Sequence, residues 1–262
     1  MIRHLAPRLA PLRLAQLVLA PLGLAAALAA TPVLAFDITN MTDAEKAAFG
    51  DAVRDYLVAN PETIVDAINV LEDRQNQAQA QADFDLVDQY ADQIFNDGYS
   101  WVGGNPDGDI TLVEFMDYRC GYCRKAQPEV SELLKTDGNI RLIIKEFPIL
   151  GDASMISSRF AIAVKQVAGD DAYGQVHDIL MAFSGDPTDV ALRRISDGLG
   201  LDSDAILAAM DSDAVTQEIA TTRKLAQDLQ INGTPTFVLQ DELLRGFVPG
   251  DQMEVMIADK RG

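Results

Sequence analysis

Two cysteines with two residues between them carry the clearest chemical signal in this sequence. Cys120 and Cys123 are the only cysteines among 262 residues, and they follow an apolar, β-type run from Ile110 to Met116. The segment after this run has helical character, so Cys120 falls at a helix N-terminus, where free N–H groups and the helix dipole favour thiolate over thiol. A second thiol one turn later can attack a mixed disulfide formed by the first. The spacing predicts a two-electron redox pair, with Cys120 as the exposed nucleophile and Cys123 as the resolving thiol.

Other uses of a Cys-x-x-Cys pair explain these residues less well. A structural disulfide across so short a loop would remove little entropy from the unfolded chain. A structural zinc site needs four ligands, and His4 and His177 are the only histidines. A c-type haem site needs histidine directly after the second cysteine, where this chain has Arg124. The sequence therefore predicts no cofactor and no metal site, although copper(I) held by soft thiolates stays open as an alternative.

Residues 1–35 have the pattern of a secretory signal peptide. Three arginines precede an apolar stretch from 14 to 30, and small residues before Ala35 offer a cleavage site. A membrane anchor is the alternative, but the apolar stretch is close to the minimum length for a span and contains Gln16, Pro21 and Gly23. We therefore expect a periplasmic or otherwise exported protein, cleaved near Ala35.

The charge balance is strongly acidic. The full chain carries a net charge of −19, and cleavage after Ala35 would lower it to −22, because the removed segment holds three arginines and no acid. Such a charge argues against nucleic acid and against anionic membrane surfaces as partners.

Residues 36–99 predict two helices ahead of the redox motif. Thr42 and Glu45 have capping-box spacing, and the helix that they start should end near Ala59. A second helical pattern begins at Pro61, a favoured first position, and meets no further Pro or Gly before Gly98.

The apolar stripe of this second helix is narrow, and its middle, residues 75–82, is rich in Gln and Ala. Such a helix cannot bury much surface alone, which favours an oligomerisation segment over 36–99. A helix folded back on the rest of the protein is the alternative.

The sequence pattern of residues 100–262 predicts one α/β domain. The turn-rich stretch 101–108 marks its start, and the apolar run 140–147 predicts a second strand, parallel to the first. Residues 152–230 are helical in pattern, followed by a hairpin over 236–248 and a final helix from Gly250. This order predicts an α/β thioredoxin fold with a helical insert at about 152–212, preceded by a helical stalk.

Several motifs resemble those of the DsbA-like branch of the thioredoxin superfamily. They are Glu114-Phe-x-Asp-x-x-Cys-Gly-Tyr-Cys, Lys145-Glu-Phe-Pro-Ile-Leu-Gly151 and Gly233-Thr-Pro-Thr-Phe237. Ahead of them, residues 56–65 resemble the amino-terminal segment of the suppressor-of-copper-sensitivity C (ScsC) proteins. The resemblance implies an exported thiol-disulfide oxidoreductase, and the ScsC-like members include a trimeric disulfide isomerase.

The resemblance also implies roles for single residues. Cys120 matches the nucleophile, Cys123 the resolving thiol and Glu114 a buried acid that accepts the Cys123 proton. Pro235 matches a cis-proline facing the disulfide, and Thr234 would offer backbone hydrogen bonds to an extended client. From the residues alone, Pro235 could equally begin a strand, and Glu114 could face water.

The dipeptide between the cysteines departs from the strongly oxidising enzyme of the family. That enzyme has Pro-His, whereas this chain has Gly121-Tyr122. Tyrosine can offer only a neutral hydroxyl, so we expect a less oxidising pair. Arg119, Arg124 and Lys125 could restore part of the effect or remain solvated surface charges.

Three functions stay open at this point. The first is a disulfide isomerase or reductase, acting as a homo-oligomer, with a trimer favoured by the resemblance, on unfolded or misoxidised exported proteins. The second is a monomeric dithiol oxidase that a membrane thiol-disulfide partner recharges. The third is a protein that holds copper or a client through its thiols without turnover.

Overall fold

The computed structural model describes residues 38–262. The predicted signal peptide and the cleavage site near Ala35 lie outside the described residues. The chain divides into two compact units, the first ending at Thr63 and the second running from Ile64 to Gly262. Within residues 38–262, no helix has both the length and the apolar character needed to cross a membrane.

In the first unit, α1 (Asp43–Ala59) begins with the predicted capping box. The Glu45 N–H donates to Thr42 Oγ1 at 3.3 Å, and the Thr42 N–H donates to Glu45 Oε2 at 2.8 Å. No residue of α1 is buried. Its exposed side chains include Phe49, Val53 and Tyr56, so α1 leaves apolar surface open.

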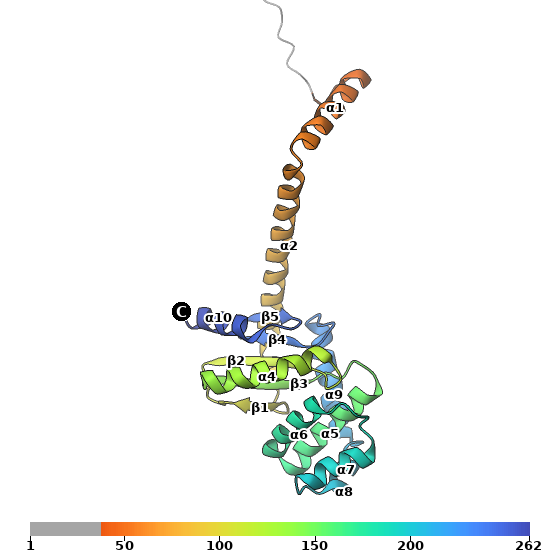
Figure 1. Cartoon of the computed structure of the whole chain (residues 1–262), viewed down its shortest axis with the longest axis vertical. Coiled ribbons are helices and arrows are strands. Elements are labelled where there is room, and N and C mark those ends of the chain that lie inside the picture. The colour runs from red at the N-terminus through yellow and green to blue at the C-terminus, as the bar shows by residue number, and fades with distance from the viewer. Residues whose placement is uncertain (1–37) are drawn as a thin grey trace, which may run out of the picture. The chain divides into compact units, whose positions relative to one another are not determined.

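The second unit is built around a five-stranded sheet in the order β1-β3-β2-β4-β5 (Figure 1). Its strands are β1 (Trp101–Gly104), β2 (Ile110–Met116), β3 (Ile140–Glu146), β4 (Thr236–Leu239) and β5 (Glu242–Arg245). The parallel pairing predicted for β2 and β3 is confirmed, and the other three pairings are antiparallel.

Strand β1 corrects the prediction of a turn-rich boundary. It forms in spite of two glycines because it lies against β3, where Trp101 faces Ile144 in register. At Gly104, φ is +66°, and a Cβ would come within 2.4 Å of the Ile140 carbonyl oxygen. Glycine here therefore permits a close backbone approach.

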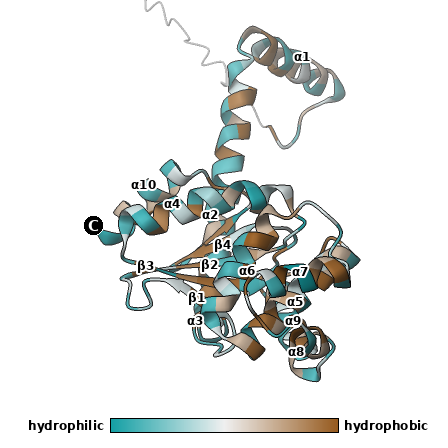
Figure 2. Ribbon diagram, turned by 60° about the horizontal axis from the view of Figure 1, so that its bottom comes forward, coloured by the Kyte–Doolittle hydropathy of each residue, from teal (hydrophilic) through white to brown (hydrophobic). Residues whose placement is uncertain are grey.

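Helices cover both faces of the sheet. On one face lie α4 (Gly121–Asp137) and α10 (Gly250–Arg261), whose Val130 and Met253 join the larger core cluster. The other face carries the end of α2 (Glu62–Gln89), α3 (Ala91–Phe95) and α9 (Asp213–Asp228). The strands between these layers are mainly hydrophobic (Figure 2), as expected for strands buried on both faces.

The helical region predicted after β3 is confirmed. It contains α5 (Asp152–Ala168), α6 (Asp170–Ala182), α7 (Asp189–Gly198), α8 (Ser203–Ala209) and then α9. Glycine and aspartate residues lie in the breaks between these helices, as at Gly169 and from Gly185 to Asp186.

The prediction of an uninterrupted helix from residue 61 to the region of Gly98 is wrong in its last part. Helix α2 ends at Gln89, and α3 starts after Tyr90, whose φ of −106° and ψ of 14° break the helical geometry. The break brings Val87 and Ile94, which are 2% and 0% exposed, into one core cluster beneath the sheet. No Pro or Gly lies at this break, so the local sequence gives no signal for it. Tertiary packing overrides the local helix propensity here.

The same region is anchored by a buried ion pair. Asp97 pairs with Lys145 of β3, and the two side chains are 8% and 0% exposed. Lys145 also donates to the Gln93 carbonyl oxygen at 2.9 Å.

We expect Asp97→Asn to destabilise the fold by about 3–5 kcal/mol, because it leaves the buried Lys145 ammonium without its counter-charge. Urea unfolding would measure the change, with Asp92→Asn on the exposed side of α3 as a matched control. Equal stability of the two variants would contradict a structural role for the pair.

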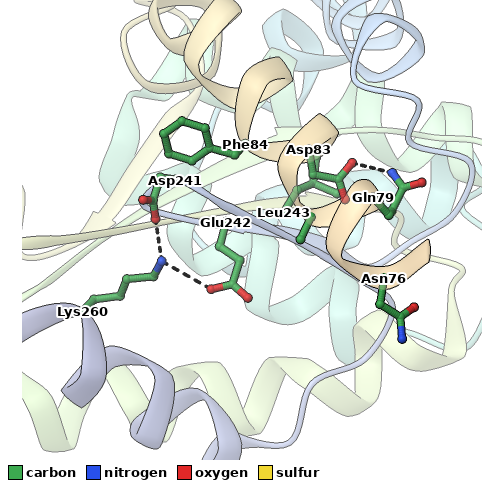
Figure 3. A pocket seen from close by; sticks show the side chains of 9 residues that line it. Asn76, Gln79, Asp83, Phe84, Asp241, Glu242, Leu243 and Lys260 are labelled. Carbon is green, nitrogen blue, oxygen red and sulfur yellow. Dashed lines mark hydrogen bonds and ion pairs between the residues drawn. The ribbon is translucent and has the colours of Figure 1, made fainter. Parts of the chain in front are cut away.

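The carboxyl-terminal half of α2 also packs on the β4–β5 hairpin. Asp83 forms an ion pair with Arg245 of β5. A pocket of 340 Å³ lies beside this contact, between α2 and the hairpin. On the side of this pocket away from Asp83, Lys260 forms ion pairs with Asp241 and Glu242 (Figure 3).

Candidate functional site

The two cysteines lie where β2 passes into α4. Cys120 is the N-cap of α4, with φ −75° and ψ 120°, and its N–H donates to the Asp117 carbonyl oxygen at 3.0 Å. Both cysteines are free thiols in this structure. The predicted position of Cys120 at a helix N-terminus is therefore correct, although its thiol makes no capping hydrogen bond to the first turn.

The two thiols differ in their exposure. Cys123 is 0% exposed and Cys120 is 7% exposed, so Cys120 is the more accessible thiol but less open than the sequence suggested. Burial raises the pKa of Cys123 well above its usual range, and the Glu114 carboxylate adds to the effect. Cys123 therefore keeps its proton until a base takes it.

The loop before β4 covers Cys120. The Thr234–Pro235 peptide bond is cis, and the Cys120 thiol donates to the Thr234 carbonyl oxygen at 3.1 Å. The Gly246 N–H donates to the Pro235 carbonyl oxygen at 3.0 Å, which ties this loop to the end of β5. Thr234 and Pro235 also line a pocket of 250 Å³. The structure thus brings together residues that are 114 positions apart in the sequence.

Glu114 is a buried acid without a hydrogen-bond partner. It is 1% exposed, and neither of its carboxyl oxygens contacts a donor within the described chain. Burial raises its pKa to about 8. A carboxyl group with this pKa, acting electrostatically on Cys123, can exchange a proton near neutral pH.

We expect the buried Glu114 to make the reduced protein less stable as the pH rises. The pKa of Glu114 in the fold is about 8, against a usual 4.5, so the folded state binds the proton more tightly than the unfolded state. The folded protein therefore loses stability as the pH rises from 4.5 to 8. The loss approaches about 5 kcal/mol at its upper limit.

Guanidinium unfolding of the reduced protein at pH 5 and pH 8 would test this. Glu114→Leu should be more stable than the unmodified protein at pH 8 and should lose most of that advantage at pH 5. Glu254→Leu replaces an exposed acid of α10 and serves as control. A Glu114→Leu advantage that did not change with pH would contradict the raised pKa.

Asp117 anchors the loop in front of Cys120, a role that the sequence did not reveal. It is 0% exposed. Its Oδ1 accepts from the Arg119 N–H, and its Oδ2 accepts from the N–H groups of Ile149 and Leu150 at 2.8 and 3.0 Å. The aspartate of the Glu114-Phe-x-Asp motif was the available signal, but only the structure shows what it binds.

Apolar side chains surround the mouth of the site. Tyr122 is 63% exposed and Leu150 is 53% exposed, and the Tyr122 ring lies 6.4 Å from that of Phe247. Such exposed apolar groups can contact an unfolded chain.

The basic side chains near the motif have other partners. Arg119 donates to the Gly185 carbonyl oxygen, Arg124 donates to the carbonyl oxygens of Tyr118 and Phe183, and the Lys125 ammonium lies 4.0 Å from the Phe247 ring centre. They therefore brace the loop and α4.

Within residues 38–262, no group of three or more His, Cys, Asp and Glu side chains is placed to hold a metal.

Comparison with known families agrees with this geometry. Residues 111–259 match the model described as the DSBA-like thioredoxin domain. The chain belongs to the DsbA-like thioredoxin family. Residues 45–78 match the model described as the copper resistance protein ScsC N-terminal domain, which confirms both parts of the resemblance seen in the sequence. The predicted thioredoxin fold with a helical insertion and preceding helices is confirmed as well.

Solved structures resemble this DsbA-like chain over most of their length. A thioredoxin-like oxidoreductase from Silicibacter pomeroyi is 42% identical with a TM-score of 0.60, covering 65% of this chain and 96% of that one. ScsC of Proteus mirabilis in a transitional conformation is 26% identical with a TM-score of 0.61, covering 84% and 98%.

A curated relative shows that similar sequences occur within longer proteins. The Na(+)/H(+) antiporter NhaA 3 of Salinispora tropica is 30% identical over 136 residues, which are 52% of this chain and 21% of the antiporter. The chain thus spans about a fifth of the length of this relative.

Proposed function

We propose that this protein is an exported thiol-disulfide oxidoreductase that acts mainly as a protein disulfide isomerase or reductase. The observation that carries the proposal is the geometry around Cys120. Cys120 is the N-cap residue of α4, and its thiol donates to the carbonyl oxygen of Thr234, just before Pro235. The buried Cys123 follows one turn later, and an unpaired acid, Glu114, is near enough to affect it electrostatically.

The reaction begins when the Cys120 thiolate attacks one sulfur of a client disulfide. A mixed disulfide forms, and the other client sulfur leaves as a thiolate. In isomerisation, a client thiolate then attacks the mixed disulfide or another client disulfide, and the enzyme finally returns as the dithiol. In reduction, Cys123 gives its proton to Glu114 and attacks Cys120, which releases the reduced client and leaves the enzyme as a disulfide.

The loop before β4, which contains Thr234 and Pro235, supports this role. With Cys120 against the Thr234 carbonyl and Pro235 beside it, an extended client would lie along this loop. Tyr122 and Leu150 supply apolar surface for clients whose hydrophobic residues are still exposed. Gly121 and Tyr122 place no positive charge beside Cys120, which favours an isomerase or reductase over a strong oxidase.

The preceding helices support an oligomer. Helix α1 buries none of its residues, and the first half of α2 exposes Ile64, Ile68 and Leu71. Apolar residues in such numbers on exposed helices indicate a protein interface. We therefore propose a homo-oligomer, with a trimer suggested by the likeness to ScsC.

Four measurements on the purified chain separate the candidate functions. An isomerase should unscramble ribonuclease with wrong disulfides and should reduce insulin in the presence of glutathione. A fast oxidation of reduced ribonuclease without unscrambling would instead indicate an oxidase. Tight copper(I) binding with no turnover in either assay would contradict the proposal.

A further inference from the structure

A chain of buried polar side chains links the active-site loop to the surface between α4 and α6, and the proposed reaction uses none of them. Its centre is Glu146 at the end of β3, which is 3% exposed. Glu146 Oε1 lies 2.8 Å from the Tyr118 hydroxyl and 2.6 Å from the Tyr173 hydroxyl, and Oε2 lies 2.6 Å from Ser158 Oγ.

The chain continues through a histidine to the surface. The Tyr118 hydroxyl lies 3.2 Å from His177 Nδ1, and His177 Nε2 lies 3.2 Å from Gln127 Oε1. At the surface, Gln127 Nε2 donates to Asp178 Oδ1 at 2.8 Å. Tyr118 and His177 are 0% and 2% exposed, so the contact between them is buried.

The hydrogen positions follow from the outer end of the chain. Because the Gln127 amide nitrogen faces a carboxylate, its oxygen faces His177, and an amide oxygen can only accept. His177 Nε2 therefore carries hydrogen. In a neutral imidazole this leaves a lone pair on Nδ1, so the Tyr118 hydroxyl donates its single hydrogen there. The short contact between Tyr118 and Glu146 then requires that Glu146 be the donor.

One other arrangement has the same number of protons, with Glu146 ionised and His177 charged. Burial opposes both charges, since it raises the pKa of Glu146 to about 8 and lowers the pKa of His177 to about 4. The other groups acting on this site are neutral hydroxyls or acids. Glu218 of α9 acts on Glu146, and Glu114 of β2 acts on Tyr118. The neutral arrangement is therefore favoured.

We propose that Glu146, Tyr118 and His177 form a neutral hydrogen-bond relay, in which the Glu146 carboxyl group donates to Tyr118 and Tyr118 donates to His177, and that this relay positions the loop that presents Cys120. Tyr118 lies two residues before Cys120, and its carbonyl oxygen accepts from Arg124 Nε at 2.7 Å. Fixing the Tyr118 ring thus holds both the loop and the first turn of α4. These are positioning residues, and their effect on redox chemistry rests on the proposed function.

The first test reads the hydrogen positions without any assay of activity. The chain holds two histidines, so ¹⁵N NMR of the ¹⁵N-histidine-labelled, reduced full chain gives two ring systems, and His4→Gln assigns them. We expect His177 to be neutral at pH 7 with its hydrogen on Nε2. A hydrogen on Nδ1 alone, or a charged imidazolium, would overturn the relay whatever the protein's activity.

The second test measures the redox equilibrium of the cysteine pair with glutathione. Loss of the Tyr118 hydroxyl loosens the loop and weakens the helix N-terminus as a partner of the Cys120 thiolate. Tyr118→Phe should shift the equilibrium about fivefold toward the disulfide, the equivalent of one typical buried hydrogen bond. Glu146→Gln keeps a donor toward Tyr118 and should stay within about twofold of the unmodified protein.

Ser158→Ala is the matched control, because it removes a hydrogen bond to the same carboxyl group without breaking the relay. An equal shift in Ser158→Ala and Tyr118→Phe would overturn the positioning role. A cysteine pair that does not equilibrate with glutathione would overturn the proposed function, while the His177 hydrogen position would still decide the relay.

Discussion

Cys120→Ser is expected to abolish thiol-disulfide exchange, whereas Cys123→Ser should accumulate client proteins as mixed disulfides. The two variants differ because Cys120 is the more accessible thiol at the start of α4 and Cys123 is fully buried behind it. Without the Cys120 sulfur, no thiolate lies at the helix N-terminus to begin the attack. Without the Cys123 sulfur, no second thiol releases a bound client.

Non-reducing electrophoresis of each variant with a reduced and a scrambled client would measure both outcomes. Cys120→Ser should show neither turnover nor adducts, and Cys123→Ser should show adducts that dithiothreitol removes. Ser131 lies on α4 away from the motif, so Ser131→Ala is a suitable control. Adducts formed by Cys120→Ser through Cys123 would reverse the assignment of roles.

Removal of residues 36–78 should give a folded monomer that has lost nearly all isomerase activity but still exchanges simple dithiols. Several active sites facing one client raise the effective thiolate concentration around it. A monomer loses this advantage, so we expect its isomerase activity to fall by about tenfold or more. The second unit begins at Ile64, but the truncation ends at 78 because the residues after it pack on the sheet and the β4–β5 hairpin. Asp83 pairs with Arg245, and Val87 and Ile94 lie in the core of the second unit.

Point variants test the same idea without truncation. Ile68→Lys and Leu71→Lys change exposed residues of α2, so together they should dissociate the oligomer and leave the fold intact. Gln75→Lys, which is also exposed on α2, should leave the oligomer unchanged. Sedimentation gives the oligomeric state, and ribonuclease unscrambling gives the activity. A truncated monomer that unscrambled ribonuclease as well as the full chain would contradict the proposal.

The features that the sequence predicted well depend on short stretches of chain. The redox motif, the capping box at Thr42 and the parallel pairing of β2 with β3 are all confirmed, because each follows from local spacing or from an apolar run. The helix break at Tyr90 and strand β1 were missed. Both exist because distant elements pack against them, and no local signal marks them.

The site shows the same limit. The sequence could suggest Glu114 as an acid, but only the fold shows that it has no hydrogen-bond partner among the described residues. The relay through Tyr118, Glu146 and His177 joins residues from β3, α6 and the active-site loop. The sequence did not predict it, since nothing in the spacing of these residues connects them.

The most direct test of the central claim is a redox titration of the full chain in glutathione buffers, with trapping of free thiols by an alkylating agent and mass measurement of the intact protein. A two-electron pair predicts one transition between a doubly alkylated form and a form with no alkylation, which carries one Cys120–Cys123 disulfide. A stable singly alkylated species, a disulfide between chains, or thiols that stay reduced in every buffer would contradict the account.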